Sequence, residues 1–223
     1  NKPEFELVKM HSLTSKGSYD GKNLELENVY AKNENGYLSA SGYIPFDLNI
    51  GSDNFGKFFI DKPINLKSKA DLSDLPFLSP YITDLDSADG NYKINLNIEG
   101  LIDNLKRDGD IVIQNGVLHT QLLNDPIKFI NGKAILTNNR LKIETLSARI
   151  ARDNEKHKDE NLQNTQINGE VNLNKFFNPH YDLKLFSKDA SFRLLSLNIT
   201  GTTNLDLSIS GRDTVYILSL IHI

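Results

Sequence analysis

Tyr92-Lys-Ile-Asn-Leu-Asn-Ile98 alternates apolar and polar side chains with a period of two. A β-strand projects successive side chains to opposite faces, so this segment places Tyr92, Ile94, Leu96 and Ile98 on one face and polar residues on the other. Strict alternation of this kind predicts a strand with one dry face and one face in water. The segment therefore favours an all-β fold.

The same alternation returns elsewhere along the chain. Further apolar residues spaced by two are Leu24 and Leu26, Leu141 and Ile143, and Leu205, Leu207 and Ile209. The spacing of such runs predicts about fifteen strands. Asn-Gly pairs between the runs predict hairpin turns at Asn35-Gly36, Asn115-Gly116 and Asn131-Gly132.

Helices are disfavoured because Asn, Asp, Gly and β-branched residues are frequent and a 3.6-residue period is missing. The exception is Leu72–Ile82, where Leu75, Phe77, Leu78 and Tyr81 suit one face of a short helix. Pro76 and Pro80 limit the length of that helix.

Three blocks of sequence recur in the same order further along the chain. The pairs are 22–31 with 139–148 (offset 117), 40–44 with 167–171 (offset 127) and 90–100 with 201–211 (offset 111). Ordered recurrence predicts a repeat protein, with internal repeats at about 5–100 and 101–211. The extra length of the second copy lies in 152–161, which has no apolar residue and predicts a solvated hairpin loop.

One irregularity occurs at the same place in both copies. The apolar residues Leu24, Leu26, Val29 and Ala31 step by two, three and two, and so do their counterparts Leu141, Ile143, Leu146 and Ala148. One extra residue moves every later side chain to the other face unless a β-bulge absorbs it. We therefore predict bulges at Glu27-Asn28 and at Glu144-Thr145. A turn at the same place is the alternative.

Composition and motifs disfavour several function classes. The chain has 223 residues, with 25 basic and 29 acidic ones, and this charge balance is not that of a nucleic-acid-binding protein. Cysteine is absent, and no histidine stands at a metal-ligand spacing. No nucleophile-elbow, P-loop or dinucleotide-binding motif occurs either. We expect a protein that is not an enzyme and that has no cofactor or metal.

Both ends of the sequence suggest a fragment. The first residue is Asn1, so we expect the natural start to lie upstream. The last six residues, 218–223, resemble the translation of a transposase-derived sequencing adapter, although a short apolar strand is the alternative. We expect the native β-repeat region to comprise residues 1–217.

Several of these blocks together carry a family resemblance. A glycine-bounded strand at 90–100 precedes a strand that ends in Asn115-Gly116, and a Leu-x-Ile strand at 141–143 precedes a glycine-centred strand at 167–173. Over most of 5–217 this order resembles the TamB branch of the AsmA-like, bridge-like lipid-transfer superfamily.

The resemblance implies an elongated, strongly curled repeat β-sheet that forms an open apolar groove, a shape described as taco-like. It implies a segment in the periplasm of a diderm bacterium, part of a protein anchored in the inner membrane. The implied role is outer-membrane biogenesis with transport of phospholipid. The implied partners are phospholipid acyl chains and an Omp85-type outer-membrane barrel, the latter through a region outside this chain.

The residues expected to line the groove are those of the alternating runs. They are Leu24, Leu26, Tyr92, Ile94, Leu96, Ile98, Leu141, Ile143, Leu205, Leu207 and Ile209. A structural or adhesive β-repeat protein with a filled core is the alternative, since most alternating strands pack against a second layer.

Overall fold

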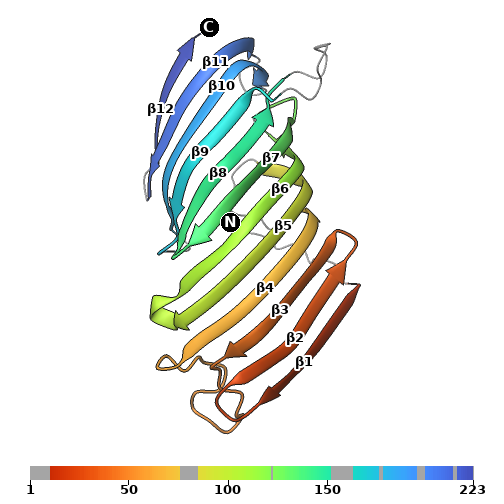
Figure 1. Ribbon diagram of the computed structural model, residues 1–223, viewed down its shortest axis with the longest axis vertical. Coiled ribbons are helices and arrows are strands. Elements are labelled where there is room, and N and C mark those ends of the chain that lie inside the picture. Colours follow the sequence, from red (N-terminus) through yellow and green to blue (C-terminus); the bar gives the residue numbers. More distant parts are fainter. Residues whose placement is uncertain are drawn as a thin grey trace.

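The computed structural model describes residues 11–75, 85–121, 123–151, 163–175, 178–194, 199–212 and 215–222. These residues form one sheet of twelve strands in which every strand pairs antiparallel with its neighbours in the chain (Figure 1). The all-β fold predicted from the alternation is confirmed.

The strands are long for a globular protein, and several exceed ten residues. Their bounds are β1 Ser12–Tyr19, β2 Leu24–Asn33, β3 Gly36–Ile44, β4 Pro63–Asp74, β5 Leu85–Leu101, β6 Lys106–Thr120, β7 Ile127–Thr137, β8 Arg140–Arg149, β9 Thr165–Asn172, β10 His180–Leu194, β11 Ile199–Gly211 and β12 Val215–His222. A three-residue 3₁₀ turn, η2 (Ile102–Asn104), joins β5 to β6.

The sheet is open, because its first strand pairs only with β2 and its last only with β11. Figure 1 shows the strands following one another along the long axis of the molecule as a twisted ribbon. None of the helical structure in the described part of the chain is long and apolar enough to cross a membrane.

The helix expected within 72–82 does not begin at Leu72, because Leu72–Asp74 belong to β4. Residues 76–82 lie outside the described residues, as does the loop predicted at 152–161. The strands on either side of that loop, β8 and β9, pair antiparallel.

One of the three Asn-Gly turns is confirmed and two are wrong. Asn35-Gly36 joins β2 to β3, whereas Asn115-Gly116 lies inside β6 and Asn131-Gly132 lies inside β7. Asn115 has a φ of 53° at an irregularity of the ladder, where the backbone of Gly116 lies close to Gly90 on β5. The positive φ that favours Asn in tight turns also suits a bulge, so the dipeptide alone does not separate the two.

Both predicted bulges are confirmed. The β2–β3 register shifts between Leu26 and Val29, and the β8–β9 register shifts between Ile143 and Leu146. The four apolar residues around the first bulge pair with Ile44, Gly42, Ala40 and Leu38, which alternate regularly along β3. Directly opposed residues share a face, so the bulge keeps all four on one side of the sheet.

The recurring blocks fall on strands six apart in the sheet. The first block falls on β2 and β8, the second on β3 and β9, and the third on β5 and β11. An ion pair recurs with them, because Lys16 on β1 pairs with the bulge residue Glu27, and Lys133 on β7 pairs with the bulge residue Glu144 at 3.5 Å. Both members of this pair are displaced by 117 positions, like the first block itself.

One carboxylate accepts three hydrogen bonds in the hairpin between β1 and β2. Asp20 accepts hydrogen bonds from the Asn23 side chain at 2.9 Å and from the backbone N–H groups of Asn23 and Lys22 at 2.7 and 2.8 Å. These hydrogen bonds, that of the Asn23 side chain first, lower the pKa of Asp20 to about 2.

A lowered pKa means that Asp20 contributes stability above its unfolded-state pKa of about 3.9, and that this contribution is lost as the pH falls toward about 2. Asp20→Ala should therefore lower the melting temperature at pH 7 and lower it much less near pH 2. Thermal unfolding of both proteins over this range, with Asp53→Ala as the control, checks the prediction. A loss that persists unchanged at the lowest pH would contradict it.

Candidate ligand-binding surfaces

The cross-strand register assigns each side chain of the sheet to one of two faces. A row of directly opposed residues runs through Ile94 from β1 to β11. Its members are Leu13, Ala31, Leu38, Ala70, Ile94, Ile111, Ala134, Ile143, Gly169, Leu183 and Ile209. All of them are Leu, Ile, Ala or Gly. We call this side of the sheet the Ile94 face.

All eleven residues predicted to line a groove lie on the Ile94 face. Ile94, Ile143 and Ile209 belong to the row above. A second row joins Tyr92 to Leu207, a third joins Leu96 to Leu141, and a fourth joins Leu26 to Ile98. Leu24 and Leu205 lie two residues from Leu26 and Leu207 on the same strands, so they share the face.

Burial on the Ile94 face differs between its middle and one end. Ile94, Leu96 and Ile98 are half-buried, and Leu38 and Leu13 are 43% and 60% exposed. In contrast, Leu75, Leu85, Ala88 and Tyr92 form a buried cluster, with Leu72, Ile113 and Leu118 packed against it. This end of the first repeat is therefore packed like a protein core, and Ile130, Leu136, Ala148 and Ala190 are also buried further along the sheet.

The opposite side of the sheet, which we call the Lys93 face, carries polar side chains. The row next to that of Ile94 is Thr14, Tyr30, Ser39, Lys69, Asn95, Asp110, Ile135, Lys142, Glu170, Asp182 and Ser210. Lys93 and Asp206, which the alternation predicts to be in water, also lie on this face.

A shallow cavity of about 610 Å³ crosses β2 to β6. It is lined by Glu27, Asn28, Ser39, Ala40, Ser41, Lys67, Ser68, Lys69, Asn95, Leu96, Asn97, Asp108 and Gly109. These residues comprise two adjacent rows of the Lys93 face and the row between them, which is Ala40, Ser68, Leu96 and Gly109, while the flanking Ile94-face residues Leu66, Ile94 and Ile98 do not line it. The cavity therefore opens on the Lys93 face, and we call it the polar cavity.

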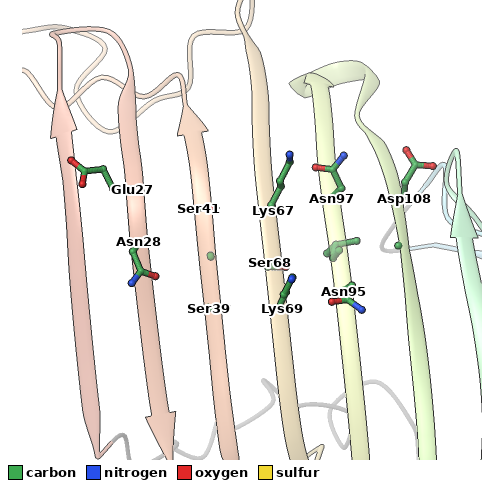
Figure 2. Close-up of a pocket in the computed structure, with 13 residues that line it drawn as sticks. Glu27, Asn28, Ser39, Ser41, Lys67, Ser68, Lys69, Asn95, Asn97 and Asp108 are labelled. Carbon is green, nitrogen blue, oxygen red and sulfur yellow. The ribbon is translucent and has the colours of Figure 1, made fainter.

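Figure 2 shows the two lysines of the polar cavity on β4, between the serines of β3 and the asparagines of β5. A second cavity of about 560 Å³ adjoins it, because Glu27 lines both. Tyr43, 37% exposed on the same face, lines this second cavity.

Comparison of the chain with protein-family models, with curated proteins and with solved structures gave no significant match.

The alternation predicts the Ile94 face but not the polar cavity. Alternation assigns Lys67, Lys69, Asn95 and Asn97 to the wet side of the sheet, where a solvated surface is their ordinary role. The pairing of β3, β4 and β5 brings these side chains together, and this pairing was not predicted from the sequence. The Glu27 bulge that borders the cavity was predicted from the spacing of the apolar residues, but not as part of a site.

Proposed function

We propose that the chain is a segment of a lipid conduit, in which the Ile94 face lines an open apolar groove that shields acyl chains from water. The observation that carries the proposal is the unbroken row of aliphatic and small residues across eleven strands. The incomplete burial of these residues, most of them half-buried and Leu13 and Leu38 exposed, supports it, because a second layer over this face would bury them fully.

A conduit of this kind needs no catalytic residue. Transfer of each methylene group of an acyl chain from water to an apolar surface contributes about 0.8 kcal/mol. Rows of similar residues repeat along the sheet, so neighbouring positions bind a chain about equally well. A lipid therefore moves between equivalent positions without a deep energy minimum.

The wider setting of the proposal rests on the resemblance to the TamB branch. The segment would lie in the periplasm of a diderm bacterium, within a protein anchored in the inner membrane. It would carry phospholipid for outer-membrane biogenesis, and an Omp85-type partner would be engaged by another region of that protein.

Photo-crosslinking from the two faces tests the proposal. A photoreactive residue at Leu96 or Leu207, on the Ile94 face, should capture phospholipid in cells. The same residue at Lys93 or Asp206, on the Lys93 face, should not. The lipid captured by each variant is measured by mass spectrometry of the purified adduct.

The control positions neighbour the test positions on the same strands, so expression and strand position are matched. Equal labelling from both faces would remove the conduit proposal. Labelling of protein but not of lipid from Leu96 would favour the structural or adhesive β-repeat with a filled core.

A further inference from the structure

The polar cavity lies on the face opposite the proposed groove, so lipid transport does not account for it. It crosses four strand spacings, about 19 Å at the usual distance between strands. That length suits a short linear chain of several units better than a single small molecule.

The neutral polar side chains of the cavity are hydroxyls and amides arranged in rows, and Ala40 and Leu96 also line it. Ser39 and Ser41 on β3 lie opposite Lys69 and Lys67 on β4, which lie opposite the asparagines of β5. Hydroxyl and amide groups both donate and accept hydrogen bonds, and this is the capacity that the hydroxyls of a sugar require.

One acceptor of the cavity is unsatisfied. The side chain of Asn97 donates to Glu99 Oε1 at 3.0 Å, but its own Oδ1 is buried without a hydrogen-bond partner. A buried oxygen without a donor is unfavourable. A ligand hydroxyl reaches this oxygen only if the Asn97 side chain turns toward the cavity.

The uncompensated charge at the centre of the cavity is positive. Lys67 and Lys69 are exposed and form no ion pair with any described residue. At one rim Glu27 pairs with Lys16, and at the other rim Asp108 accepts a hydrogen bond from the Asn138 N–H at 2.8 Å but keeps its negative charge, two strands away from Lys67. The centre therefore favours an anionic group on the ligand.

Tyrosine rings stand at both ends of the serine pair on the same face of β3. Tyr37 and Tyr43 are 38% and 37% exposed, and Tyr37 stacks on Tyr30 with the ring centroids 5.8 Å apart. Exposed aromatic rings offer flat apolar surfaces on which the C–H faces of a sugar ring can pack.

Together these observations point to one ligand class: we propose that the polar cavity binds a linear acidic oligosaccharide. Lys67 and Lys69 bind its acidic groups, Ser39 and Ser41 bind its hydroxyls, and Tyr43 of the adjoining cavity packs against a ring at one end. The second repeat lacks the site, because Phe186 and Leu185 of β10 occupy the places that correspond to Lys69 and Ser68.

Isothermal titration of the chain with tetragalacturonate tests this proposal. We expect one site per chain, and we expect Lys67→Gln with Lys69→Gln to weaken binding by about tenfold or more, since two charge-assisted contacts are lost. Tyr43→Ala should also weaken binding. The matched control is Lys142→Gln with Lys184→Gln, which removes the same charge from the same face outside the cavity and should leave the affinity unchanged.

Three results would overturn the proposal. They are no binding at millimolar tetragalacturonate, an equal loss of affinity in the cavity and control variants, and equally tight binding of a polyphosphate of the same charge. The last two would mean that the face responds to charge alone. Circular dichroism of each variant shows that the sheet is retained.

Discussion

Replacing Gly42 by alanine should destabilise the sheet by about 2–4 kcal/mol. Gly42 has a φ of 133°, a backbone conformation open to glycine and strained for any residue with a Cβ. An added Cβ would also overlap the carbonyl oxygen of Asn65 on β4, so β3 and β4 would have to separate. Urea unfolding followed by circular dichroism measures the loss.

The requirement for glycine at position 42 is explained by the bulge on the neighbouring strand β2. Gly42 pairs with Leu26, the last residue before the β2 bulge, and Gly169 pairs with Ile143, the last residue before the β8 bulge. Gly169 has a φ of 126°, and its added Cβ would overlap the Asp182 carbonyl oxygen in the same way. Gly169→Ala should therefore cost a similar amount.

Gly51→Ala is the matched control, because that glycine has no positive φ and its added Cβ would meet only Asn49 Oδ1 at 3.7 Å. Its effect should stay within about 0.5 kcal/mol. If Gly42→Ala were as mild as the control, the bulge and its glycine would not be coupled.

The alternation of Tyr92–Ile98 was sufficient to predict the all-β fold and the face of each predicted site residue. Side chains alternate between the two faces along a strand, so the face of each side chain follows from its own strand and not from the strand that pairs with it. The apolar residues step by two, three and two in both repeats, and this shared irregularity was sufficient to predict both bulges. A strand that has one extra residue between Leu26 and Val29 can keep its apolar residues on one face in few other ways.

Properties that depend on several strands at once were not predictable in this way. The two wrong Asn-Gly turns are an example, since Asn115 takes its positive φ because Gly90 on β5 allows a close approach of the two backbones. The polar cavity is another, since Lys67 and Asn97 are thirty residues apart and only the β4–β5 register brings them together. Period and propensity carry no information on such pairings.

Tyr92→Ala should cost about 3–4 kcal/mol, the second large effect that we expect. Tyr92 is 3% exposed, it packs in the cluster with Leu75, Leu85 and Ala88, and its hydroxyl donates to the Asp89 carbonyl at 2.9 Å. Truncation leaves a cavity and removes the donor. Tyr43→Ala, at a tyrosine 37% exposed, should cost less than about 1 kcal/mol in the same unfolding experiment.

The same experiment on Leu96 separates an open face from a filled one. Leu96 is half-buried and lies four residues beyond Tyr92 on the same face of β5. If the middle of the Ile94 face is open to a ligand, Leu96→Ala should cost only about 1 kcal/mol, since part of the side chain already meets water. A cost equal to that of Tyr92→Ala would mean that the face is packed along its length like a core. The chain would then be a structural β-repeat, with no room for an acyl chain.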